Sequence, residues 1–112
     1  MQITTETFGE IVVAHAPDDL TEDTVSLLQQ AIRDIVAAGR KSVVLQMDQT
    51  DAFDSVGLTA LVDLQDELKR SGAALKICGL GDSGQKIFEM TRLTRRFDLF
   101  DSVIDAVSTF RI

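Results

Sequence analysis

Cysteine, proline and large aromatic residues are scarce in this 112-residue chain, which has one cysteine, one proline and no tryptophan or tyrosine. The single cysteine, Cys78, excludes an intramolecular disulfide and a metal site built from several cysteines. We expect it to be a small buried side chain on a strand. No Pro/Gly/Ser-rich linker and no internal repeat divides the sequence, which favours one domain over residues 1–112.

Long hydrophobic runs and basic clusters are also missing. No apolar run approaches the roughly 20 residues that a membrane span requires. QITTETF after Met1 has neither the basic region nor the apolar region of a secretory signal peptide. We therefore expect a cytoplasmic protein without direct membrane insertion. The net charge is −7, and the lysines and arginines form no cluster larger than an adjacent pair such as Arg95-Arg96. This charge argues against a nucleic-acid or anionic-membrane surface and favours a protein partner.

Three short runs rich in β-branched residues predict strands: EIVVAHA at 10–16, KSVVLQM at 41–47 and AALKICGL at 73–80. Each is bounded by glycine, proline or aspartate. An earlier segment, QITTETF, precedes Gly9 and is expected to pair with the first run as a hairpin.

Apolar residues at helical spacing predict helices between these strands. The first predicted helix has its apolar stripe over residues 25–36, with Thr21 as N-cap and Gly39 just past the end of the helix. The second carries Leu58, Leu61, Leu64 and Leu68 and ends before Gly72.

Two shorter helices are expected after the last strand. DSGQKIFEMTRL offers Asp82 or Ser83 as a cap, and DSVIDAVSTF offers Asp101 or Ser102. Residues 97–100 leave room for one further short strand.

The element order is therefore β-β-α-β-α-β-α-α. It predicts an α/β fold with a mixed, mostly parallel sheet of four to five strands and about four helices, in which the first hairpin supplies the antiparallel strand. In the third predicted strand, Lys76 points away from Leu75 and Ile77. We expect one face of the sheet to be less fully covered than the other.

GLGDSG at residues 79–84 is a G-x-G-x-x-G sequence between a strand and a helix, where a dinucleotide pyrophosphate could bind. Only 28 residues follow Gly84, too few for the rest of such a fold. A tight turn with a helix cap explains the glycines more simply. A small nucleotide-binding protein is therefore the weakest of the functional hypotheses.

Catalytic and metal sites find little support. FDSVG resembles half of a serine nucleophile elbow, but it lacks the first glycine, and the sole histidine, His15, precedes the serine. Asp48, Asp51 and Asp54 could offer oxygens to a hard cation, yet loop aspartates more often bond their own backbone. We expect no enzyme activity, no metal and no cofactor, and a hydrogen-bonded role for His15 in the sheet.

The segment AFDSVGL at residues 52–58 marks the change from strand to helix. Asp54 or Ser55 can cap the second helix, whose N-terminal N–H groups surround the serine with partial positive charge. Helical geometry places Val56 opposite the leucine stripe, on the side of Ala60, Asp63 and Glu67. An exposed valine between Ser55 and Gly57 is a low-profile apolar spot where a partner could dock.

The chain resembles the STAS domain family, which includes anti-sigma-factor antagonists. The resemblance rests on the element order, on F-D-S-x-G-L at residues 53–58, and on GLGDSGQKIFEMTRLTRRFDLFDSVIDAV, which is similar to the family's third helix, L/M-T-x-L turn and tail. It covers nearly the whole chain. The resemblance implies a non-enzymatic switch that binds a protein kinase/anti-sigma factor and is released when a serine or threonine at this junction is phosphorylated.

The resemblance also implies roles for single residues. Asp54 matches the aspartate before the acceptor, and Asp19 matches the aspartate of a neighbouring loop whose glycine is Ala16 here. Val56 stands where anti-sigma antagonists carry the acceptor, while Ser55 matches the acceptor of stressosome-type members and is the phosphorylation candidate. The partner-binding residues implied are Asp19, Asp54, Ser55, Val56, Gly57, Thr59, Ala60 and Asp63. Because some STAS domains are permanent subunits of transporter or ATPase assemblies, such an assembly is the alternative partner.

Overall fold

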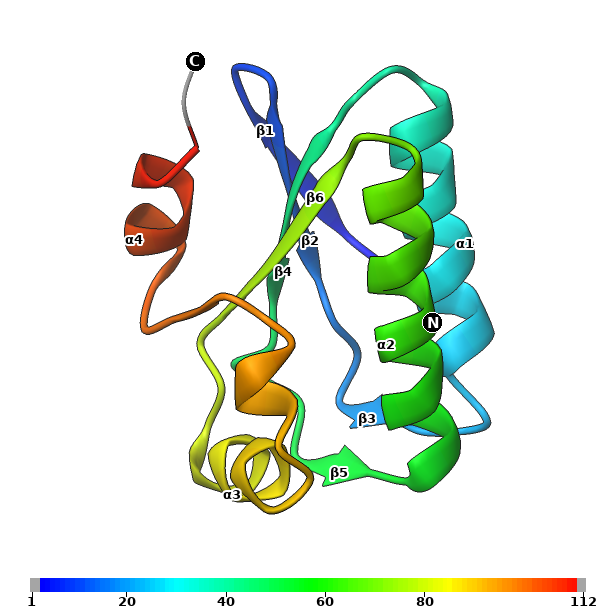
Figure 1. Ribbon diagram of the computed structural model, residues 1–112, viewed down its shortest axis with the longest axis vertical. Coiled ribbons are helices and arrows are strands. Elements are labelled where there is room, and N and C mark those ends of the chain that lie inside the picture. The colour runs from blue at the N-terminus through cyan, green and yellow to red at the C-terminus, as the bar shows by residue number, and fades with distance from the viewer. Residues whose placement is uncertain (1–2, 111–112) are drawn as a thin grey trace.

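A five-stranded mixed sheet forms the centre of the computed structural model, which describes residues 3–110 (Figure 1). Its strand order is β1-β2-β4-β6-β7, and β3 and β5 form a separate pair. The strands are β1 (Thr5–Phe8), β2 (Ile11–His15), β3 (Asp19–Leu20), β4 (Ser42–Gln46), β5 (Ala52–Phe53), β6 (Ala74–Cys78) and β7 (Leu99–Phe100). The helices are α1 (Val25–Ala37), α2 (Ser55–Arg70), α3 (Asp82–Met90), the 3-10 turn η1 (Leu93–Arg95) and α4 (Val103–Ser108).

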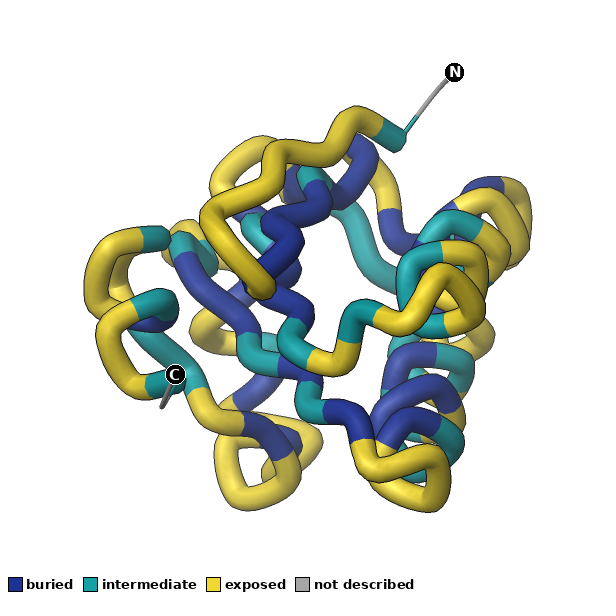
Figure 2. Tube along the Cα trace, turned by 90° about the horizontal axis from the view of Figure 1, so that it is seen from above, coloured by how far each residue is buried: buried dark blue, intermediate teal, exposed yellow. Residues whose placement is uncertain are grey.

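The predicted hairpin and parallel sheet are both confirmed. β1 pairs antiparallel with β2 around Gly9, whose φ of 62° suits glycine, and the other sheet pairs are parallel. All four β1 residues are exposed, whereas four of the five β2 residues are buried (Figure 2). The hairpin strand therefore forms an outer edge of the sheet.

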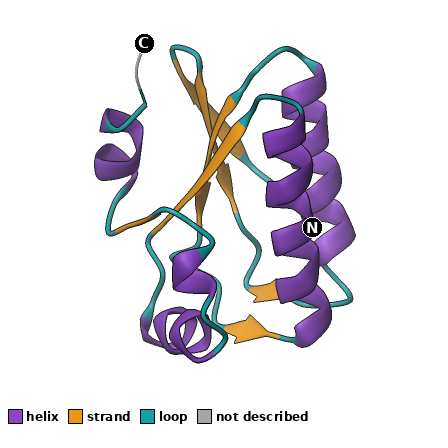
Figure 3. Ribbon diagram, viewed as in Figure 1, coloured by secondary structure: helices purple, strands orange, loops and turns teal. Residues whose placement is uncertain are grey.

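One face of the sheet is covered by α1 and α2, which run side by side (Figure 3). The leucine stripe of α2 is buried as predicted, with Leu61, Leu64 and Leu68 at most 2% exposed. Leu28 and Ile32 of α1 join them in the core over the central strands. Each fully buried side chain of this size contributes roughly 2 kcal/mol of hydrophobic stabilisation, so this layer fixes both helices.

In the described part of the chain, residues 3–110, the opposite face carries only α4, which confirms the expected difference in coverage. Ala106 of α4 is fully buried in a small cluster with residues of β2, β4 and β6. Lys76 points to this face, where its Nζ lies 4.3 Å from the ring centre of Phe110 and 2.7 Å from Thr109 Oγ1. The lysine therefore holds the end of the α4 segment by a cation–π contact and a donated hydrogen bond.

Two predicted helix caps are wrong. α1 begins at Val25, with Thr24 rather than Thr21 at the N-cap position. The Thr24 hydroxyl donates to the Asp19 carbonyl oxygen at 2.6 Å, while Thr21 Oγ1 accepts a local turn bond from the Asp23 N–H. Hydroxyls near a helix start often bond the backbone in this way, which competes with capping.

The cap of α3 differs as well. Gly81 occupies its N-cap position, so the helix starts one residue earlier than a cap at Asp82 would allow. The expected cap at Ser102 of α4 is present and accepts from the Asp105 N–H at 3.1 Å. No helix within residues 3–110 is long and apolar enough to cross a membrane.

Candidate partner-binding site

Asp54 caps α2 and at the same time ties it to the loop before α1. Its Oδ1 accepts from the Gly57 N–H at 2.7 Å, and its Oδ2 accepts from the Glu22 N–H at 3.0 Å. Of the two candidate caps, the aspartate takes the position, and Ser55 becomes the first helical residue. One carboxylate therefore satisfies backbone donors that are 35 positions apart in the chain.

These bonds also set the charge at the helix start. The N–H groups of Glu22 and then Gly57 lower the pKa of the Asp54 carboxyl below its ordinary value. The carboxylate therefore stays ionised through the neutral range, directly before Ser55.

Gly57 is required by packing. A Cβ built on this residue would lie 2.1 Å from the carbonyl oxygen of Leu20 and 2.6 Å from its carbonyl carbon. Only glycine lets the end of β3 come this close to the first turn of α2. Sequence reasoning placed Gly57 in a motif but gave no sign of this contact, because Leu20 is distant in the chain.

The β3–β5 pair brings Asp19 beside the junction. Asp19 pairs with Ala52 and Leu20 pairs with Phe53, in parallel. This agrees with the neighbouring position that the family resemblance implies for Asp19, whose side chain is exposed. The segment at Asp19 and the junction that starts α2 thus lie side by side.

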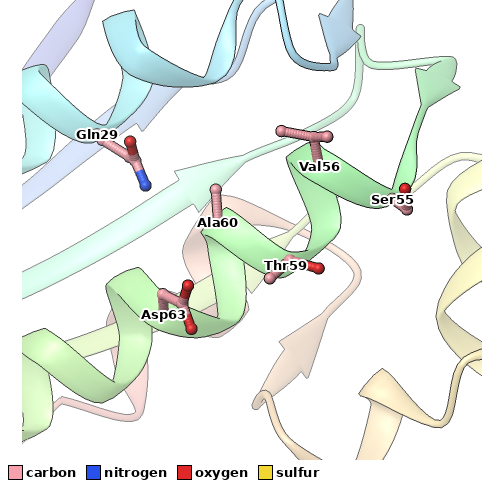
Figure 4. Close-up of a pocket in the computed structure, with 6 residues that line it drawn as sticks. All are labelled: Gln29, Ser55, Val56, Thr59, Ala60 and Asp63. Carbon is pink, nitrogen blue, oxygen red and sulfur yellow. The ribbon is translucent and has the colours of Figure 1, made fainter.

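A shallow hollow of about 360 Å³ lies along the outer side of this junction (Figure 4). Val56, predicted to face outward, is 46% exposed. Gln29 of α1 reaches towards Ala60 from the opposite side. The hollow unites most of the implied binding residues, with lining side chains from Gln29, Ser55, Val56, Thr59, Ala60 and Asp63.

One helical turn beyond the hollow, an ion pair joins the two helices. Arg33 donates from Nε and Nη2 to the Glu67 carboxylate at 2.9 and 3.1 Å. Arg33 follows Gln29 by four positions on α1, and Glu67 follows Asp63 by four on α2. The ion pair therefore lies one helical turn from the hollow, on the same faces of the two helices. The hydrogen bond from Arg33 lowers the pKa of Glu67.

A second hollow, of about 230 Å³, lies on the other side of Ser55. It runs between α2 and the segment that follows α3, with Ser55, Leu58, Thr59, Val62, Thr91 and Leu93 as its lining. Ser55 and Thr59 line both hollows. Sequence reasoning missed Gln29, Thr91 and Leu93, because only tertiary packing brings these segments beside α2.

The remaining sequence candidates have structural roles. His15 Nε2 lies 2.7 Å from Glu6 Oε1 on the neighbouring strand, as expected of a hydrogen-bonded sheet histidine. Cys78 is buried on β6, and burial raises the pKa of its thiol to about 11, with a smaller effect of Asp48. Within residues 3–110, no three His, Cys, Asp or Glu side chains are arranged to hold a metal ion.

Two glycines of GLGDSG are explained by the fold. Gly79 has a φ of 75°, which glycine adopts readily. A Cβ on Gly84 would lie 2.8 Å from Leu80 Cδ2 and 3.4 Å from the ring of Phe53. Backbone conformation and close packing therefore account for these positions.

The model of the STAS domain family matches residues 2–106. The chain belongs to the STAS domain family. Its fold is shared by an anti-sigma factor antagonist from Mycobacterium paratuberculosis, with a TM-score of 0.85 and 22% identity over 99% of this chain and 94% of that one.

Two further solved structures show the range of proteins that share the fold. The Bacillus cell fate determinant SpoIIAA, solved in its phosphorylated form, has a TM-score of 0.72 and 16% identity over 97% of this chain and 99% of that one. A sulfate transporter family protein from Wolinella succinogenes has a TM-score of 0.79 and 15% identity over 92% and 86% of the two chains. This STAS domain therefore resembles anti-sigma-factor antagonists in fold and also a transporter-family protein.

Proposed function

We propose that this STAS domain is a non-enzymatic, cytoplasmic regulatory module that binds a protein kinase/anti-sigma factor in a partner-switching pathway. It would bind through the junction surface, which we define as Asp19, Asp54, Ser55, Val56, Gly57, Thr59, Ala60 and Asp63. The observation that carries the proposal is Val56, 46% exposed at the start of α2, which Asp54 ties to the loop before α1, and beside a shallow hollow. An apolar side chain held in a fixed position suits a protein contact.

The chemistry of the hollow supports binding rather than catalysis. Asp63 is the only carboxylate among the six lining residues, and none of the six is a histidine, lysine, arginine or cysteine. A catalytic centre needs an acid, base or nucleophile paired with a partner group. Small and apolar side chains over a shallow surface instead favour a close protein–protein contact.

Phosphorylation of Ser55 is the proposed control. Ser55 is exposed and begins α2, so a phosphoryl group there would meet the positive end of the helix dipole. It would add roughly −1.5 to −2 charges beside the ionised Asp54. The bound partner would be released by like-charge repulsion and by the cost of desolvating the new charge.

A pull-down from native lysate tests the proposal. The bait proteins are the wild type, Val56→Asp, Ser55→Asp and the control Ile104→Asp, which places the same charge on α4 at a side chain that is 78% exposed. We expect the wild type and the control to retain a kinase-type protein that both junction variants lose. Retention of that protein by Val56→Asp would contradict the proposed surface.

The phosphate is tested separately by mass spectrometry after incubation with ATP and lysate. We expect modification at Ser55 and its absence in Ser55→Ala. If the protein binds its partner but carries no phosphate at Ser55 under any condition, the proposed binding function stands and the proposed control by phosphorylation is wrong.

A constitutive subunit of a transporter or ATPase assembly is the second candidate. Val56 in place of an acceptor and the fold shared with the Wolinella sulfate transporter family protein favour it. This function predicts stoichiometric co-purification with a membrane-associated ATPase that phosphatase treatment does not change. Recovery of a soluble kinase instead would count against it.

A further inference from the structure

Charge is distributed unevenly along the chain. Residues 1–68 hold thirteen of the eighteen acidic residues and only three of the eleven basic ones. Residues 69–96 hold seven basic residues and two acidic ones. An acidic protein therefore has one basic region, and this region includes α3 and η1 beside the junction.

Three arginines lie exposed at the turn from α3 through η1: Arg92, Arg95 and Arg96. Arg96 Nη2 donates to Asp66 of α2 at 3.2 Å, which bridges the turn to the helix. Arg92 and Arg95 form no ion pair with any residue in the described part of the chain. Two guanidinium groups are therefore free to meet carboxylates from outside.

The backbone of Arg92 has a conformation that residues other than glycine seldom adopt. Its φ of 61° and ψ of 22° are left-handed, and it is the only non-glycine residue with positive φ in residues 3–110. It follows the C-cap residue of α3, Thr91, where glycine is the usual choice. A strained residue on an exposed turn points to a use for its side chain.

The second hollow lies directly beside this turn. Thr91 and Leu93 line it, and Arg92 stands between them in the chain. Leu58 and Val62 of α2 supply its apolar wall, and both are half-buried. The turn that carries the exposed Arg92 and Arg95 thus borders an apolar depression, an arrangement complementary to an apolar side chain flanked by acidic ones.

We propose that this arginine-edged hollow binds a segment of the protein partner in which an apolar side chain is flanked by carboxylates. The apolar side chain enters between α2 and the α3–η1 turn, and the carboxylates pair with Arg92 and Arg95. The rest of this acidic chain, whose net charge is −7, would repel a partner that is anionic over a wide area, such as a membrane or nucleic acid, more strongly than a short acidic segment that reaches only this hollow.

The inference rests on the proposed function and extends it to regulation. Ser55 lines both the junction hollow and the arginine-edged hollow. A phosphate on Ser55 would therefore stand beside the acidic segment of the partner as well as beside Val56. One modification would weaken both contacts by charge repulsion.

Selection of random twelve-residue displayed peptides on the intact protein tests the inference. We expect enriched peptides to combine leucine, isoleucine or phenylalanine with an excess of aspartate and glutamate. The strongest one, made synthetically, should bind about tenfold more weakly to Arg92→Gly/Arg95→Gln, because two exposed charge contacts are lost. Lys69→Gln/Arg70→Gln, which removes the same charge at the far end of α2, should change its Kd less than about twofold.

Four results would overturn the inference: no enriched peptide, enrichment of neutral or basic peptides, equal weakening by both double variants, or equally tight arginine-dependent binding of anionic phosphatidylserine vesicles. The proposed function fails separately. If the pulled-down partner is lost with Val56→Asp but kept with Arg92→Gly/Arg95→Gln, the junction function stands and the inference about the arginines is wrong.

Discussion

Asp54 decides the local structure of the junction at the scale of single residues. Its two carboxylate oxygens accept from backbone N–H groups of two different segments. Ser55 is the first residue of α2 and exposed to solvent, and its hydroxyl bonds no other residue among 3–110. The residue that caps the helix and the residue proposed to be modified are therefore different, although they are neighbours.

The stability of the fold should depend on pH through Asp54. Its pKa is lowered in the folded protein, so its stabilisation is complete above the ordinary aspartate pKa of about 3.9 and is lost as the pH falls through the lower folded value. Asp54→Asn should lower the urea midpoint at pH 6 and have a smaller effect at pH 3. An equal effect at both values would show that the ionised carboxylate contributes nothing, and Asp101→Asn serves as an exposed control.

Arg92→Gly should leave the protein as stable as the wild type or raise its stability by up to about 1 kcal/mol. Glycine adopts the left-handed conformation without steric cost, although it loses more backbone entropy on folding. Thermal unfolding measures this effect, with Arg95→Gly as the control, since that change in a 3-10 turn should be destabilising. A clear fall in the Tm of Arg92→Gly would show that the side chain stabilises the fold.

The helices and main strands could be predicted because their information is local. The leucine stripe of α2 and the β-branched runs of β2, β4 and β6 specify these elements within a few residues. The two-residue strands β3 and β5 could not be predicted, because they exist only through their pairing with each other. The start of α1 was misplaced because Thr24 bonds the Asp19 carbonyl, a contact outside the helix.

On the surface of the junction, too, some features could be predicted from local sequence, and others depend on tertiary packing. Val56 was correctly placed outward from helical periodicity alone. Gln29 and Leu93 were missed, since each reaches the hollows from a separate element. Periodicity tells which side of one helix is exposed, and only the packed fold tells which other elements border that side.

The packing of the β3–α1 loop on α2 predicts a severe effect of Gly57→Ala. Its methyl group would overlap the Leu20 carbonyl oxygen, which is backbone and cannot rotate away. We expect a loss of about 3 kcal/mol in the free energy of unfolding, measured by urea denaturation. Gly81→Ala is the control, because no atom lies within 4 Å of its Cβ and only about 1 kcal/mol of cap preference should be lost. Similar losses in the two variants would contradict the close approach.

At the scale of the whole molecule, the two faces of the sheet differ in how firmly they are covered. α1 and α2 bury a continuous core, whereas the other face has one six-residue helix over a small cluster. The acidic charge is also concentrated in the first 68 residues, which include α1 and most of α2. Packing and charge are thus both asymmetric, and the proposed binding surfaces lie on the well-packed side.

The net charge of −7 should make thermal stability depend on salt. Self-repulsion among the acidic residues opposes folding, and the arginine–carboxylate ion pairs found in residues 3–110 are two exposed ones of little stabilising value. Raising NaCl from about 50 to about 500 mM should therefore increase the Tm, measured by calorimetry. A fall in Tm would mean that these pairs outweigh the repulsion.

The bridge from Asp54 to the backbone of Glu22 has a consequence for anyone who would transplant this surface onto another scaffold. The α2 peptide alone, grafted with its serine and valine, would arrive without the loop that fixes its first turn. The transplantable unit consists of two chain segments, the β3–α1 loop and the β5–α2 junction, and both must be moved in register.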